Sequence, residues 1–215
     1  INSSSRDYVA RLNTDGTLDT SFTAPVGGQV RTLAVLPDGK ILIGGYFITV
    51  GGVSRSRLAR LNANGTLDTT FETSGANAAI HTLVVQPDGK ILAGGDFTSL
   101  GGVARNYIGR LNPDGSIDDS FNPGASNPIY TLSLQTDGKI LVGGMFSTLA
   151  GEASNRIGRL TPEGALDYDF NGGANDYVYS VAQQPDGKTL VGGIFSTLGG
   201  IARQSVARVS TPQAA

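Results

Sequence analysis

The sequence predicts an all-β fold built from tandem units of short antiparallel strands, and three observations support this prediction. The tripeptide Asp-Gly-Lys recurs at intervals of 50, 49 and 49 residues, a period typical of repeat architectures. A Gly-Gly pair, followed two residues later by phenylalanine, keeps the same interval. Glycine supplies 31 of the 215 residues, which suits many strands joined by tight turns. The four tripeptides begin at Asp38, Asp88, Asp137 and Asp186.

Each unit contains four strand candidates. Residues 30–35 alternate apolar and polar side chains and end at Pro-Asp-Gly, and residues 40–43 run into the Gly-Gly pair. Residues 57–61 end at Asn-Gly, and residues 66–68 are a short fourth candidate that leads to Phe71. Asp-Gly and Asn-Gly between such runs indicate hairpins, because residues there can adopt positive φ. Four strands linked in this way form the antiparallel blade of a β-propeller.

We therefore expect residues 1–215 to form a single β-propeller domain of four-stranded blades, with about 49 residues per repeat. A helical fold is excluded because glycine interrupts every long window. A β-solenoid is disfavoured because its coils repeat in shorter periods without paired hairpins. The first two strands of the unit occur four times, whereas the third occurs five times. The sequence is compatible with four blades, with five, or with an arc of a larger propeller.

The repeated motif also resembles a known family. It reads Leu-x-x-x-Pro-Asp-Gly-Lys-Ile-Leu-x-Gly-Gly-x-Phe, then Arg-Leu-Asn-x-(Asp/Asn)-Gly-(Thr/Ser)-(Leu/Ile)-Asp-x-x-Phe, and it is clearest at residues 83–97 and 110–121. This motif resembles the delta-60 repeat family of bacterial proteins, and the Gly-Gly pair is similar to that of the kelch blade. The resemblance implies a β-propeller and a secreted or cell-surface bacterial protein. It implies little about biochemical activity.

Composition excludes several classes of partner. The net charge of −2 and the pI near 5.3 give no general attraction to phosphate backbones, so we expect no nucleic-acid partner. The chain has no cysteine, which excludes disulfides, thiolate metal sites and cysteine nucleophiles. No apolar run approaches the roughly 18–20 residues that span a bilayer, so we expect no membrane insertion. Residues 1–6 lack a starting Met and a signal-peptide apolar region, which indicates a mature or trimmed form or a segment of a longer protein.

Most of the repeated residues are expected to be structural. An arginine in the third strand precedes an aspartate in the fourth by eight residues, and a hairpin places such residues opposite each other, so we predict ion pairs. The segments 13–19 and 112–118 offer oxygen ligands around a glycine, as calcium loops do, but they lack the later bidentate glutamate. We therefore expect hairpin turns there, and neither a metal site nor a cofactor. The predicted ion pairs are Arg11–Asp19, Arg60–Asp68, Arg110–Asp118 and Arg159–Asp167.

Two varied positions are the candidates for ligand binding. The Asp-Gly and Asn-Gly turns on one face of a blade hardly vary, whereas the loops on the other face do, as expected where a repeat scaffold binds a ligand. At the entry to the first strand, a polar and aromatic rim of the central channel would comprise Arg31, His81, Tyr130 and Tyr179. Between the second and third strands, guanidinium groups would suit acidic glycans, carboxylates or sulfates. This second set comprises Arg6, Arg55, Arg105 and Arg203, with Ser154 at the equivalent place.

Each set also has a structural interpretation. The first could consist of ordinary outward residues of an alternating strand, and the second could contact the neighbouring blade or solvent.

These features predict a noncatalytic binding or scaffolding propeller that engages a glycan or a protein partner. The alternatives are a propeller enzyme acting on a carbohydrate, and a purely structural subunit that contacts a neighbouring subunit in a surface assembly. An enzyme normally breaks the repeat with one asymmetric cluster of acid–base groups. We expect no enzyme, because the non-repeated acidic residues show no evident pairing. They are Glu72, Asp96, Glu152, Asp169 and Asp176.

Overall fold

The computed structural model describes residues 8–170 and 172–210, and regular secondary structure within them consists of β-strands alone. The first sheet has the strand order β1-β2-β5, formed by Val30–Val35, Ile41–Gly45 and Leu58–Leu61. Three further antiparallel sheets of the same order follow along the chain. They are β6-β7-β10 (Ile80–Val85, Ile91–Gly95, Ile108–Leu111), β11-β12-β15 (Ile129–Leu134, Ile140–Gly144, Ile157–Leu160) and β16-β17-β20 (Val178–Gln183, Thr189–Gly193, Val206–Val209). We call the four sheets, in this order, blades 1 to 4.

The predicted fourth strand is shorter than the other three, although its segment does form backbone hydrogen bonds with the third strand, as the N–H of Asp68 does with the carbonyl oxygen of Arg60. The predicted fourth strand is reduced to a single isolated bridge, such as Leu61 with Leu67. The side chain of Asp68 accepts hydrogen bonds from the backbone N–H and the hydroxyl of Thr70, so the segment turns away after one pair. Each blade also has a two-stranded hairpin between its second and third strands. These are β3-β4 (Thr49–Val50, Val53–Ser54), β8-β9 (Ser99–Leu100, Val103–Ala104), β13-β14 (Thr148–Leu149, Glu152–Ala153) and β18-β19 (Thr197–Leu198, Ile201–Ala202).

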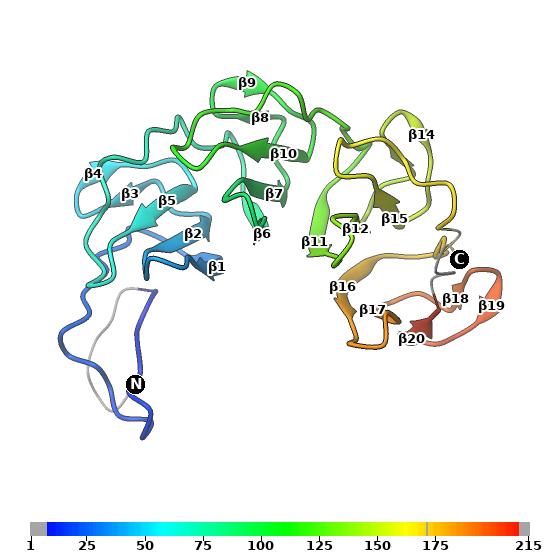
Figure 1. The fold of residues 1–215 in the computed structure, drawn as a ribbon, viewed down its shortest axis with the longest axis horizontal. Helices are drawn as coiled ribbons and strands as arrows, with labels where there is room; N and C mark the ends of the chain where they lie inside the picture. The colour runs from blue at the N-terminus through cyan, green and yellow to red at the C-terminus, as the bar shows by residue number, and fades with distance from the viewer. Residues whose placement is uncertain (1–7, 171, 211–215) are drawn as a thin grey trace.

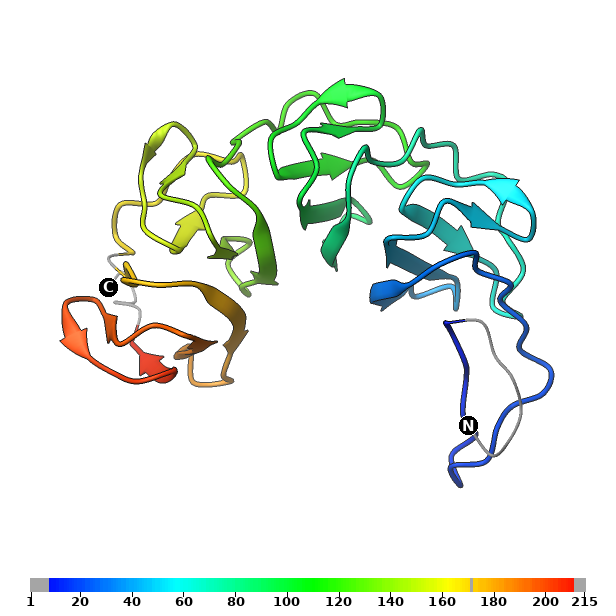
Figure 2. The same cartoon turned by 180° about the vertical axis from the view of Figure 1, so that it is seen from behind.

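The blades follow one another around an open arc (Figure 1; Figure 2). Strands β1, β6, β11 and β16 line its concave side, and each contacts the next. The small hairpins lie on the convex side. Residues 8–22 continue the arc beyond blade 1, and blade 4 forms the other end. The described residues therefore adopt the arc arrangement rather than a closed ring of four or five blades.

Glycine allows neighbouring blades to pack closely. A Cβ on Gly44 would lie 2.8 Å from Cγ2 of Ile80 in the next blade, and Gly94 meets Ile129 in the same way at 2.7 Å. The recurring phenylalanines, among them Phe47 and Phe97, are fully buried. The hydrophobic clusters combine residues of adjacent blades, so the core lies at the interfaces between blades as well as within them.

The predicted ion pairs of the repeat are confirmed. Arg110 Nε lies 2.8 Å from Asp118 Oδ2, and the three equivalent pairs are separated by 2.7–2.8 Å. Lys90, from the Asp-Gly-Lys turn, reaches the same carboxylate oxygen at 2.9 Å. Arg110 also donates to the backbone carbonyl of Pro162 in the next blade and stacks over the ring of Phe121. The repeated arginine thus joins two turns of its own blade to the neighbouring blade.

Candidate functional site

A β-bulge at the start of each inner strand positions the candidate ligand-binding side chains. The register between β6 and β7 shifts between Ile80 and Thr82, so His81 is the unpaired residue. The same shift occurs in the other three blades. Bulges re-aim side chains and are frequent beside functional sites. The four residues displayed in this way are Arg31, His81, Tyr130 and Tyr179, the set predicted at the entry to the first strand.

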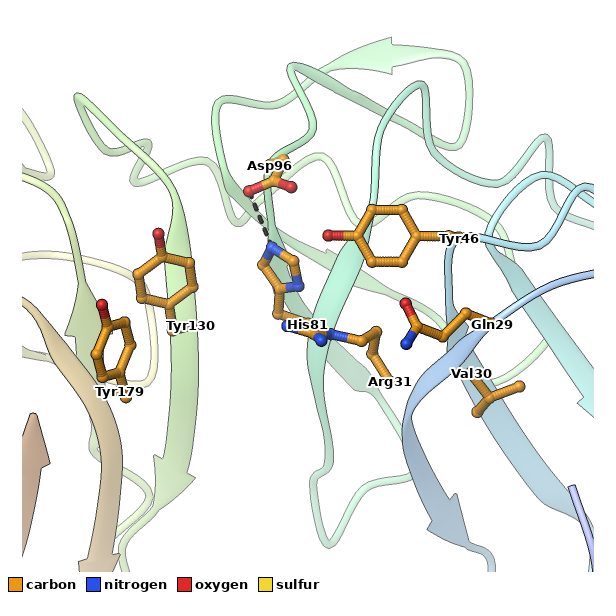
Figure 3. A pocket seen from close by; sticks show the side chains of 8 residues that line it. All are labelled: Gln29, Val30, Arg31, Tyr46, His81, Asp96, Tyr130 and Tyr179. Carbon is orange, nitrogen blue, oxygen red and sulfur yellow. Dashed lines mark hydrogen bonds and ion pairs between the residues drawn. The ribbon is translucent and has the colours of Figure 1, made fainter. Parts of the chain in front are cut away.

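The structure brings these four side chains together into one row along the concave side of the arc (Figure 3). The ring centroids of His81 and Tyr130 are 5.5 Å apart, and those of Tyr130 and Tyr179 are 5.3 Å apart. Tyr46 extends the row, with its ring 6.1 Å from that of His81. The guanidinium of Arg31 lies 5.8 Å from the centre of the Tyr46 ring. The row therefore begins with a cation and continues through four rings.

The row lines a cavity of 770 Å³ that is completed by Gln29, Val30 and Asp96. His81 Nε2 and Asp96 Oδ1 are 2.9 Å apart, and only 6% of the His81 side chain is exposed. His81 Nδ1 is buried and has no hydrogen-bond partner among the described residues. Burial, and then the charge of Asp96, raise the pKa of Tyr130 above its ordinary value. Tyr130 therefore keeps its phenolic proton at neutral pH, and its hydroxyl donates that proton to the sulfur of Met145.

Sequence reasoning did not place Tyr46 and Asp96 in this site. Both follow a Gly-Gly pair at the end of the second strand, where the equivalent residues are Met145 and Ile194. This position varies between repeats as much as the entry to the first strand does, and that variation was the available signal. The bulge sets the two positions beside each other, as the hydrogen bond between Tyr130 and the sulfur of Met145 shows.

The predicted arc of exposed arginines is not part of this cavity. Arg55, Arg105 and Arg203 directly follow β4, β9 and β19, on the convex side of the arc (Figure 1). Arg105 is 5% exposed, and it pairs with Asp119 at 2.8 Å. Arg105 thus contacts the scaffold in this structure, and a role of Arg55, Arg105 and Arg203 in binding stays a prediction. Arg203 is exposed, Arg55 is half-buried, and Arg6 lies outside the described residues.

The possible calcium loops are occupied by their own hydrogen bonds. Asp114 Oδ1 accepts from the backbone N–H and the hydroxyl of Ser116, at 2.9 and 2.7 Å. Asn112 donates to the same hydroxyl, and Asp118 is paired with Arg110 and Lys90. Across residues 8–170 and 172–210, no group of three or more His, Cys, Asp or Glu side chains could hold a metal ion. The hairpin-turn interpretation accounts for these residues.

The family of the chain follows from its repeats. The model of the DUF5122 β-propeller, a domain of unknown function, matches five segments: residues 1–22, 36–71, 86–121, 135–170 and 184–211. These segments cover most of the chain and recur with the blades. The protein belongs to this β-propeller family. A comparison with curated proteins finds no match.

Solved structures with the same fold include propellers of several kinds. The WD40 β-propeller domain of Doa1 is 16% identical, with a TM-score of 0.57, and the match covers 84% of this chain and 50% of that one. An inactive variant of virginiamycin B lyase from Staphylococcus aureus, solved with quinupristin, is 18% identical with a TM-score of 0.55; the match covers 94% and 62%. The extracellular domain of a protein described as a hybrid two-component system from B. thetaiotaomicron is 14% identical with a TM-score of 0.56, covering 96% and 24%. The chain thus spans about half the length of the Doa1 domain.

Within the described part of the chain, no helix is long and apolar enough to cross a membrane.

Proposed function

We propose that this protein is a noncatalytic binding module of an exported bacterial protein, and that it binds a saccharide in the concave cavity. The observation that carries the proposal is the row of side chains on four consecutive bulges, which contribute one residue from each blade to a single surface. The ligand would therefore extend across several blades rather than occupy one enclosed pocket.

The chemistry of the row suits a saccharide with a carboxylate group. Tyrosine combines an apolar ring face with a hydroxyl that can exchange hydrogen bonds, and a sugar offers both kinds of partner. The rings of Tyr130 and Tyr179 are tilted by 45° to each other, so they do not stack fully and can contact a ligand. Arg31, exposed at one end of the row, provides a bidentate donor for a carboxylate.

Export is supported by the motif and by the fold comparison. The resemblance of the repeat to the delta-60 family points to bacterial surface proteins, and one protein of similar fold is described as an extracellular domain. The identity to that domain is 14%, so the likeness concerns the fold, and export of this chain is part of the proposal.

A propeller enzyme is the second candidate, and the His81–Asp96 pair in the cavity favours it. One of the similar folds is also named as a lyase. However, Nε2 of His81 faces Asp96 and Nδ1 is buried, so neither ring nitrogen is open to a substrate. A general base must be within hydrogen-bond reach of the proton that it removes. The pair is better explained as a support for the neighbouring rings.

An array of acidic and neutral oligosaccharides tests the proposal. Calorimetry then measures the dissociation constant of each oligosaccharide that binds. We expect Arg31→Ala and Tyr179→Ala each to weaken binding about tenfold or more, because both side chains are exposed in the cavity. Added salt should weaken saccharide binding by the wild-type protein and by Tyr179→Ala. It should hardly affect binding by Arg31→Ala, which lacks the charged group.

Two control variants locate the site. Tyr168→Ala removes an exposed tyrosine that does not line the cavity, and Arg55→Ala removes an arginine of the convex side. Both should bind as the wild type does. Binding lost in Arg55→Ala but kept in Arg31→Ala would move the site to the convex side, and binding to no saccharide would refute the proposed ligand class.

A further inference from the structure

The two ends of the arc expose positions that are buried between blades everywhere else. In blade 4, Val206 is 68% exposed and Leu190 is 38% exposed. Their equivalents in the other blades are at most 1% exposed. These equivalents are Leu58, Ile108 and Ile157 for Val206, and Leu42, Leu92 and Leu141 for Leu190.

Blade 1 shows the complementary exposure at the other end. Leu33 is 56% exposed, whereas the equivalent residues Leu83, Leu132 and Val181 are 6–7% exposed. Val35, further along the same strand, is also exposed. Large apolar side chains gathered at one end of a repeat array mark a surface that another unit covers.

The internal interfaces show which partner fits these surfaces. Leu42 and Leu58 of blade 1 share a hydrophobic cluster with Ile80 and Leu83 of blade 2. The same four positions meet at the next two interfaces. At the end of blade 4, Leu190 and Val206 are equivalent to Leu42 and Leu58. At the end of blade 1, Val30 and Leu33 are equivalent to Ile80 and Leu83.

The first glycine of the Gly-Gly pair, in the second strand of each blade, also shows that the end of blade 4 is uncovered. Gly143 allows Val178 of the next blade to approach, because a Cβ there would lie 2.7 Å from Cγ1 of that valine. At Gly192 the nearest atom to such a Cβ is Ser180 Cβ of its own blade, at 3.8 Å. In blades 1 to 3 an Ile or Val of the following blade covers this glycine, whereas Gly192 of blade 4 is uncovered.

We propose that a second copy of this chain docks head to tail, so that Leu190 and Val206 of one copy pack on Val30 and Leu33 of the other. One chain carries both halves of the interface, and they lie at opposite ends of the arc (Figure 1). A contact between two different surfaces of identical chains is heterologous and closes into a ring when the rotation permits. The inference rests on blade packing and is independent of the proposed ligand.

Docking requires one local exchange. Val9 belongs to the third strand of the repeat, as Val206 does, and it is already buried in the cluster against which Val30 packs. Residues 8–12 form no strand, but Leu12 makes an isolated bridge with Leu18, and Arg11 pairs with Asp19 and donates to the carbonyl oxygen of Ala63. Docking would exchange these contacts for the equivalent contacts of the second copy. Val206–Val209 of the second copy, paired along β17, would replace residues 8–12. Asp19 would then pair with Arg208 of that copy, as Asp68 pairs with Arg60 within the chain.

The docked copy would also lengthen the cavity. Its Tyr179 would stand beside Arg31, in the relation that Tyr130 has to His81 between adjacent blades. The row of bulge residues would then continue from one chain into the next.

Analytical ultracentrifugation of the 215-residue chain tests this inference. We expect the wild type to form dimers or larger closed assemblies, and Gly192→Val to raise the dissociation constant at least tenfold. In the single chain the nearest atom to the new Cβ lies at 3.8 Å, so the substitution is tolerated. In the dimer the new side chain would occupy the space that Val30 of the second copy enters. Leu33→Lys should have the same effect from the other end. An equal mixture of the two variants should form a 1:1 dimer, because each keeps the surface that the other lacks.

Ala202→Leu is the matched control, since it enlarges an exposed residue of the outer hairpin β18-β19, away from both end surfaces. It should associate as the wild type does. A monomeric wild type at all concentrations overturns the proposal and leaves the end surfaces to further blades of a longer chain. Association that persists in Gly192→Val, or a mixture that stays monomeric, overturns the head-to-tail geometry. Circular dichroism of each variant verifies that it is folded.

Discussion

Among single residues, Asp118 receives the most concentrated set of charged contacts in its blade. Arg110 and Lys90 both bind Oδ2, and Ser120 donates to Oδ1 from its backbone and its hydroxyl. Burial alone would raise the pKa of this carboxyl group, but the hydrogen bonds from Ser120, Lys90 and Arg110 hold it well below its ordinary value. The carboxylate is therefore charged in the folded protein at neutral pH.

We expect Asp118→Asn to lower the free energy of unfolding by about 3–5 kcal/mol at pH 7, because Arg110 is then buried without its counter-charge. The control Asp88→Asn changes an exposed turn aspartate that accepts one backbone N–H from Lys90, and it should cost about 1 kcal/mol or less. Urea unfolding followed by circular dichroism measures both. Equal losses in the two variants would contradict the role assigned to the ion pair.

The same carboxyl group makes stability depend on pH. Its folded pKa lies below the unfolded value of about 3.9, so its contribution is complete above that value and is lost as the pH falls toward the folded pKa. The pKa values of Asp68 and Asp167 are also lowered by folding. The melting temperature of the wild type should therefore fall between about pH 5 and pH 2, and Asp118→Asn should fall less steeply. Parallel curves for the two proteins would show that this pKa is unperturbed by folding.

At the level of elements, the two glycines of the Gly-Gly pair have separate roles. The first lies against the next blade, as Gly94 does against Ile129. The second lies against the bulge of its own blade, where a Cβ on Gly95 would collide with the carbonyl oxygen of Ala79. The motif therefore permits both the packing of blades and the bulge that displays His81.

Gly94→Ala should destabilise the protein by about 1–3 kcal/mol, because its Cβ meets Ile129 and Thr82 at less than 3 Å. Gly192→Ala is chemically the same change at the equivalent position of blade 4, where no atom lies closer than 3.8 Å. It should alter the stability of the single chain by less than about 0.5 kcal/mol. Thermal melts of both variants at low protein concentration give the comparison, and a similar loss in both would contradict the interblade role of this glycine.

The elements also show what the sequence could predict. Alternation and Asp-Gly turns identified the three main strands, because those features are local to the chain. The small hairpins such as β3-β4 could not be predicted, since strands of two residues have no measurable periodicity. In the candidate site, variation between repeats singled out His81 and its equivalents, which the structure places around one cavity; their role in binding stays a prediction. The contact of Arg110 with Pro162 could not be read from spacing, because it joins residues 52 positions apart in neighbouring blades.

At the scale of the whole molecule, the blades behave as a one-dimensional array in which each contacts its neighbours along the arc. The sequence left the number of blades and their closure open. Strand counting gives the units, but the curvature depends on the angle between packed blades, which no local pattern encodes.

An array of this kind should open from its ends. In the Gly192→Val variant, where docking is blocked, we expect amide hydrogens of β16, β17 and β20 to exchange faster than those of β6, β7 and β10. Blade 2 is covered on both sides and blade 4 on one, so fewer contacts must break to open blade 4. Hydrogen exchange read by mass spectrometry resolves these segments. Equal protection in both blades would indicate a single cooperative unit instead.

The bulge at the start of each inner strand has a consequence for how such proteins diversify. The bulge leaves its residue outside the hydrogen-bonded register, so this residue can be exchanged without altering the pairs on either side of it. Duplication of one unit would insert a blade with a ready-made interface and would add one new side chain to the concave row. If the concave row binds a ligand as proposed, selection could change the length of that ligand by copying units, and its chemistry by single substitutions, while the scaffold stays the same.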